Sequence, residues 1–120
     1  RVLFRSEARA LLPEGAEGEA GRIAAKVRLR LEAEGLDADA LRRRVAEEPG
    51  DLDARWGLAT ALAGAEDHEG ALGELLEIVR RNRRYRDDGA RKEMLRIFEV
   101  VGARSAIADR WRDRLAKALY

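Results

Sequence analysis

The stretch that decides the fold is residues 52–85, LDARWGLATALAGAEDHEGALGELLEIVRRNRRY. Its apolar residues recur at spacings of three and four on both sides of a short break at residues 65–68, which is the pattern of two amphipathic helices. The small residues Ala59 and Ala71 would let the two helices cross closely, and the large residues Leu62 and Leu75 would fill the space on either side of the crossing. The stretch therefore predicts an antiparallel helical hairpin.

Composition extends this prediction to the whole chain. The 120 residues include 22 Ala and 16 Leu, whereas the β-branched residues Val, Ile and Thr together number only 11. Because strong helix formers greatly outnumber the β-branched residues that favour strands, the composition predicts an all-α fold. About six main helices are expected, at residues 18–34, after N-cap Asp37, after N-cap Asp51, after the turn 65–68, at 88–101 and after N-cap Ser105.

The N-terminal part needs separate treatment. Residues 1–6, RVLFRS, resemble the translated read-through of a sequencing adapter, so we regard them as a non-native start. Residues 1–17 are therefore interpreted as this start followed by a truncated helix stub at 7–12, and residues 18–120 as one helical domain. The first main helix of that domain carries one apolar face, formed by Ile23, Val27 and Leu31.

Residues 52–85 also match the 34-residue period of the tetratricopeptide repeat. Counting from Leu52, large and small residues fall where that repeat requires them: Leu58, Ala59, Leu62, Ala71 and Leu75. Two departures are clear, because Arg55 stands at the usual aromatic position, with Trp56 one place later, and Glu66 replaces the turn glycine. The fold class is thus predicted as a tetratricopeptide-like array of antiparallel helix hairpins.

The flanking segments keep less of the repeat pattern. Residues 18–51 have the length of a repeat but few of its small residues, and 86–120 form a terminal hairpin, at 88–119, without the signature. The best repeat therefore lies between two degenerate ones.

Two short segments carry a more specific resemblance. Residues 87–92, DDGARK, and 97–102, IFEVVG, lie within a region, about 37–120, that closely resembles the C-terminal tetratricopeptide region of the bacterial YbbN/CnoX family. This resemblance implies a cytoplasmic, thioredoxin-like co-chaperone and holdase that binds client proteins and the chaperonin. It also implies a thioredoxin-like domain upstream, which would carry any redox residues. Asn82 departs from the family, which tends to have an acid there.

Composition disfavours several other classes of function. The chain has no Cys, a single histidine, His68, and two serines, so we expect no enzyme, no catalytic residue, no metal site and no cofactor. His68 is interpreted as an exposed structural residue in a turn. Because 24 basic residues balance 23 acidic ones, the chain is not expected to be a general polyanion binder, and its apolar runs are too short to span a membrane.

One basic segment supports an alternative function. Residues 80–86 contain five arginines with Tyr85 among them, an arrangement that could hold phosphates and stack a base. The alternative is therefore a nucleic-acid-binding helical domain that uses this Arg80–Arg86 linker. A solvated helix end explains the same residues more simply, because arginines are favoured near the negative end of a helix dipole. We expect no nucleic-acid partner.

Two groups of residues are candidates for partner binding. Asp53, Trp56 and Thr60 lie on the first helix of the repeat, and such helices line the concave binding surface of repeat proteins. The second group occupies the last helix, where an apolar tip with a charged flank suits a reversible contact with the chaperonin: Arg110, Arg114, Lys117, Leu119 and Tyr120. The same helix is expected to pack on the core through Trp111 and Leu115.

Overall fold

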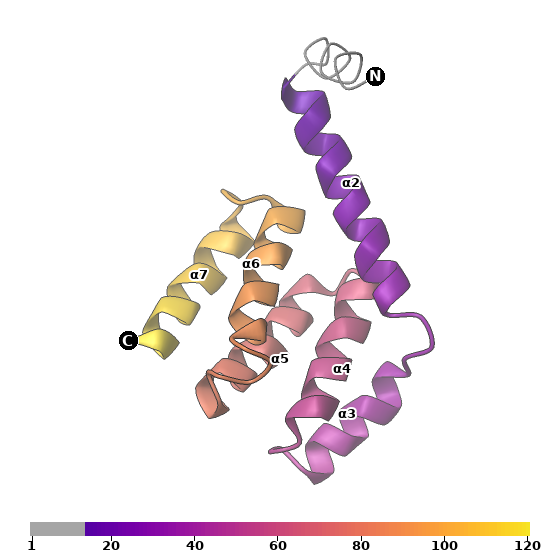
Figure 1. The fold of residues 1–120 in the computed structure, drawn as a ribbon, viewed down its shortest axis with the longest axis vertical. Coiled ribbons are helices and arrows are strands. Elements are labelled where there is room, and N and C mark those ends of the chain that lie inside the picture. Colours follow the sequence, from indigo (N-terminus) through magenta and orange to yellow (C-terminus); the bar gives the residue numbers. More distant parts are fainter. Residues whose placement is uncertain (1–13) are drawn as a thin grey trace.

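A computed structural model describes residues 14–120 as an array of six α-helices, with no strand in that range (Figure 1). The helices are α2 (Glu14–Glu32), α3 (Ala38–Glu47), α4 (Leu52–Gly64), α5 (His68–Arg81), α6 (Gly89–Val101) and α7 (Ala106–Leu119). The predicted all-α fold is confirmed. The predicted stub at residues 7–12 lies outside the described residues.

Side-chain caps fix where most of these helices begin. Asp37 accepts hydrogen bonds from two backbone amides of α3, Asp51 from Ala54 N at 3.0 Å, and Ser105 Oγ from Ala108 N at 3.1 Å. The structure thus confirms all three predicted N-caps, each of which typically contributes about 1 kcal/mol. Asp67 caps α5 in the same way, through Gly70 N.

The predicted hairpin of α4 and α5 forms the centre of the array. Ala71 is fully buried and Ala59 nearly so, while Leu62 and Leu75 fill the space beside them, as the sequence pattern predicted. Helix α5 also packs against α6 and α7, so it is covered on several sides. Its Ile78 is fully buried as well, although it occupies a position where the repeat usually has a small residue.

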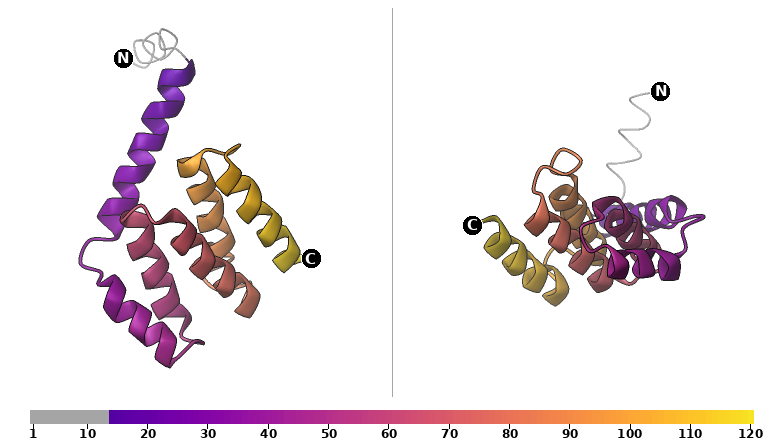
Figure 2. Two further views of the ribbon diagram at one scale, coloured as in Figure 1. Left: turned by 180° about the vertical axis from the view of Figure 1, so that it is seen from behind. Right: turned by 90° about the horizontal axis from the view of Figure 1, so that it is seen from below.

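Helix α2 departs from the predicted arrangement. It packs against α4 and α6 rather than forming a close hairpin with α3, and Figures 1 and 2 show it extending beyond the other helices. Its predicted apolar face is exposed, at 60% for Ile23, 52% for Val27 and 58% for Leu31, whereas Leu29 is buried. The reason is geometric, because α2 turns a different face to the array, the one on which Leu29 is buried and Ala25 packs against the core.

Two contacts attach the C-terminal end of α2. A Cβ atom built on Gly64 of α4 would collide with the Cβ of Ala33 and lie 3.1 Å from the Leu29 carbonyl oxygen, so glycine permits the close approach of the two backbones. On the other side, Arg96 of α6 donates to both carboxylate oxygens of Glu32, at 2.6 and 3.2 Å. This paired contact lowers the pKa of Glu32 below its ordinary value.

Helices α6 and α7 form the predicted terminal hairpin at the edge of the array opposite α3 (Figure 2). Trp111 and Leu115 are buried, which confirms the expected packing of α7 on the core. Ala108, three residues before Trp111, is fully buried too. No helix within residues 14–120 is long and apolar enough to cross a bilayer.

Candidate partner-binding site

One face of α4 carries the first group of candidate residues. Asp53, Trp56 and Thr60 follow one another at helical spacings, and Gly64 continues the same face to its contact with α2. The Thr60 hydroxyl donates to the Trp56 carbonyl oxygen at 3.0 Å within the helix. The Thr60 hydroxyl is therefore already bonded within its own helix. The Asp53 carboxylate and the Trp56 ring are the groups of this face that are left for contact with a partner.

A second element covers Trp56. Residues 82–88, here called the turn 82–88, place the ring of Tyr85 6.0 Å from that of Trp56 between centroids. The guanidinium carbon of Arg86 lies 4.8 Å from the Trp56 centroid and 5.6 Å from the Tyr85 centroid. The Tyr85 hydroxyl donates to Asp53 Oδ1 at 2.5 Å and accepts from Arg86 Nε at 3.1 Å. These four residues form one cluster, here called the aromatic cage.

Burial and charge act on the tyrosine of this cage. Partial burial, together with the hydrogen bond to Asp53, raises the pKa of Tyr85 above its ordinary value, so the hydroxyl keeps its proton. The sequence placed Tyr85 and Arg86 only in the alternative nucleic-acid linker and did not join them to Asp53 and Trp56. The available signal was a single aromatic residue inside a highly charged segment, and it gave no indication that this segment would turn back onto α4.

The turn 82–88 has a strained backbone. Arg86, Asp87 and Asp88 have φ values of 51°, 57° and 64°, three successive non-glycine residues in the left-handed region. Each such residue typically costs about 1 to 2 kcal/mol. Glu66 also has a positive φ, of 65°, at the position where the repeat usually has glycine. The contacts of Arg86 with the aromatic rings help to offset the strain of the turn.

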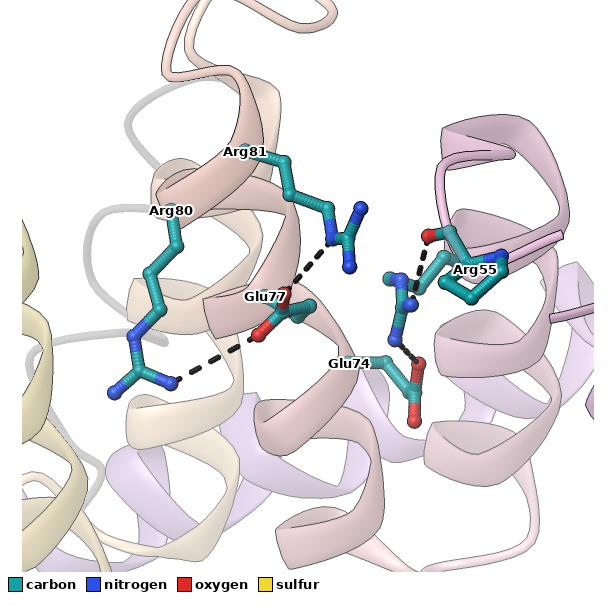
Figure 3. Close-up of polar contacts among 6 residues, drawn as sticks. Arg55, Glu74, Glu77, Arg80 and Arg81 are labelled. Atoms are coloured by element: carbon teal, nitrogen blue, oxygen red, sulfur yellow. Dashed lines mark hydrogen bonds and ion pairs between the residues drawn. The ribbon is translucent and has the colours of Figure 1, made fainter. Parts of the chain in front are cut away.

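Arg55 explains the missing aromatic residue of the repeat. It is only 8% exposed, and its guanidinium donates to Glu74 Oε1 at 2.9 Å and to the Pro49 carbonyl oxygen at 2.8 Å (Figure 3). These contacts tie α4 to α5 and to the turn before α4. A charged side chain with two acceptors thus takes the place that an aromatic ring usually fills.

Most arginines of the basic segment 80–86 have acceptors within the chain. Arg80 and Arg81 both point toward Glu77, at 3.9 and 2.8 Å (Figure 3), and Arg83 donates to the Leu119 carbonyl oxygen at 3.4 Å. Arg86 belongs to the aromatic cage. Four of the five guanidinium groups therefore have partners within the chain, although all five arginines are exposed.

The candidates on α7 are partly engaged in holding the helix in place. Glu69 Oε1 accepts from Trp111 Nε1 at 2.9 Å and from Arg110 Nη2 at 2.6 Å. These two hydrogen bonds lower the pKa of Glu69, with that from the indole contributing most. The guanidinium carbon of Arg114 lies 4.5 Å from the Trp111 ring centroid. Arg110 and Arg114 thus support the position of Trp111.

The end of α7 has a different character. Tyr120 is fully exposed, whereas Leu119, which we expected at an exposed tip, is half-buried against the core. Leu119 is drawn inward because its face of the helix continues the line of Leu115. Lys117 is exposed and lies 3.1 Å from Asp113 one turn earlier. Lys117 and Tyr120 are therefore the α7 candidates most open to a partner.

His68 differs from its predicted exposure, because it is half-buried at the first position of α5. Burial lowers its pKa below the ordinary value. Within residues 14–120, no three His, Cys, Asp or Glu side chains gather in a way that could hold a metal ion.

Comparison with known proteins agrees with this geometry. A family model described as tetratricopeptide repeat matches residues 31–120, which covers helices α3 to α7. No curated protein and no solved structure matches the chain. Tetratricopeptide repeats stack helix pairs into arrays that serve as protein-interaction modules. The chain belongs to the tetratricopeptide-repeat family.

Proposed function

We propose that this chain is the helical-repeat part of a thioredoxin-like co-chaperone that holds client proteins and contacts the chaperonin in the cytoplasm. Its place in the tetratricopeptide family supports a protein-binding role, and its resemblance to the YbbN/CnoX family supports this particular one. The thioredoxin-like domain of such a protein would precede the helical array. The array itself would supply the binding surfaces.

The observation that best supports the chaperonin contact is the exposed end of α7. Tyr120 is fully exposed next to the exposed Lys117, while Trp111 and Leu115 hold the rest of the helix in the core. An aromatic anchor flanked by a cation suits a small, reversible interface, because aromatic and charged residues at such contacts supply much of the binding energy. Arg110 and Arg114 place further positive charge along the same helix.

The α4 face is the second proposed contact, and it would serve clients. Asp53 and Trp56 form part of a polar and aromatic surface on the first helix of the best repeat, and Thr60 continues that surface toward α2. Repeat arrays commonly bind extended segments on this side. The two contacts lie on different helices, so one can be changed without altering the other.

Co-purification with the chaperonin GroEL tests the first contact. Deleting residues 116–120 should remove GroEL from the material captured with the tagged chain. Since Leu119 packs on the core, the variant Tyr120→Ala is the sharper test, because it removes only an exposed side chain. We expect it to reduce capture severalfold with unchanged helical content. Capture of GroEL at the wild-type level by both variants would place the contact elsewhere.

A further inference from the structure

We propose that the aromatic cage is a binding site for an arginine-bearing segment of a partner protein, and that Arg86 occupies this site as an internal ligand until the partner displaces it. The proposal rests on the protein-binding role given above and adds the chemistry of the segment that α4 would recognise. The evidence is the position of one guanidinium over two aromatic rings, one of which is hydrogen-bonded to a carboxylate.

The first step is that the cage suits a guanidinium group. Arg86 lies 4.8 Å from the Trp56 centroid and 5.6 Å from the Tyr85 centroid, within the range at which a cation is attracted to an aromatic face. Arginine is well suited because its flat group is weakly hydrated and stacks on rings. Asp53 completes the site, because its carboxylate holds the Tyr85 hydroxyl at 2.5 Å and adds negative charge.

The second step is that Arg86 is an exchangeable occupant. Arg86 and Asp53 are both exposed, and Trp56 and Tyr85 are only half-buried, so the cage opens to solvent. The backbone that delivers Arg86 is strained, with positive φ at Arg86 and the two residues after it. Withdrawal of Arg86 would let this turn relax, which favours its replacement by a cation that comes without that strain.

The third step is the choice of partner segment. The cage lies beside the start of α6, where an ideal Cβ on Gly89 would be 3.6 Å from the Trp56 ring, so a flexible stretch of chain reaches the cage with less hindrance than a bulky folded surface. We therefore assign an unstructured, arginine-containing peptide as the ligand. An acidic segment is excluded on charge grounds, because it would face the carboxylate of Asp53.

The probe is the peptide acetyl-Gly-Arg-Gly-Arg-Gly-amide, titrated into the full chain while the indole N–H signal of Trp56 is followed by NMR. Arg86→Gly removes the internal ligand and tolerates the left-handed φ, so this variant should fold. We expect it to bind the peptide at least threefold more tightly than wild type, because an internal competitor lowers the apparent affinity. Trp56→Leu in the same background should abolish saturable binding.

Arg84→Ala is the matched control, since it removes an equal charge from the same turn and leaves the cage intact. We expect its affinity to stay within twofold of wild type. The proposal is overturned if Arg86→Gly binds less than threefold more tightly, if Arg84→Ala gains as much, or if Trp56→Leu still binds. Equal binding of the glutamate version of the peptide would also overturn it. None of these results bears on GroEL capture through α7, which tests the proposed function separately.

Discussion

Replacing Arg55 with methionine tests how the repeat compensates for its missing aromatic residue. The change keeps an unbranched apolar stem but removes the hydrogen bonds to Glu74 and to the Pro49 carbonyl, at 2.9 and 2.8 Å. Hydrogen bonds to a charged group contribute about 1.5 to 3 kcal/mol each. Two features reduce the sum, because the Glu74 side chain is 23% exposed and can regain water, and Arg55 Nε is buried without an acceptor among the described residues.

We therefore expect Arg55→Met to lower the free energy of unfolding by about 2 to 3 kcal/mol. For a domain of this size, that corresponds to a fall of about 8 to 15 °C in the melting temperature followed by circular dichroism at 222 nm. Glu77→Gln is the matched control on the same helix pair, because among residues 14–120 Glu77 pairs with the exposed Arg80 and Arg81 alone (Figure 3). It should change stability by less than about 0.5 kcal/mol. Equal effects of the two variants would refute the assignment of Arg55 as the link between α4 and α5.

Three further predictions concern the core, one ion pair and the alternative function. Ala71→Leu should destabilise the chain by about 1 to 3 kcal/mol in urea titrations, because Ala71 is fully buried at the crossing of α4 and α5. Hydrogen bonds lower the pKa of Glu69, so its stabilising effect is complete above its ordinary pKa and is lost as pH falls. The melting temperatures of wild type and Glu69→Gln should therefore converge on acidification, and a constant difference would contradict this. Gel-shift assays should show no nucleic-acid binding at physiological salt, whereas salt-sensitive binding lost in Arg83→Ala with Arg84→Ala would support the alternative.

The features that could be predicted from the sequence are those fixed by residues close together in the chain. Asp51 and Ser105 cap the helices that follow them because a cap needs only the next few amides. The α4–α5 crossing was predictable for a similar reason, since Ala59 and Ala71 belong to helices joined by a short turn. In both cases local spacing determined the contact.

Contacts between distant segments could not be predicted in this way. The face of α2 that contains Val27 has the spacing of a buried stripe, yet the position of α2 depends on where Gly64 allows it to approach α4. Likewise, the aromatic cage forms because a left-handed turn returns Tyr85 to Asp53, 32 residues earlier in the chain. The charged segment 82–88 gives no signal for such a turn, because it lacks the periodic recurrence of apolar residues from which helices and strands are predicted.

The central claim, that this array is the chaperonin-contacting module of a co-chaperone, is tested most directly with purified components. The chain would be immobilised and its affinity for purified GroEL measured by biolayer interferometry, with Tyr120→Ala as the test variant and Arg86→Gly as the control. We predict saturable binding by the wild-type chain, weakened at least about tenfold by Tyr120→Ala because a small interface depends on its few anchors. Arg86→Gly should bind as wild type does, since the side chain of Arg86 contacts Trp56 and Tyr85 rather than α7. Absence of saturable binding by the wild-type chain would contradict the claim.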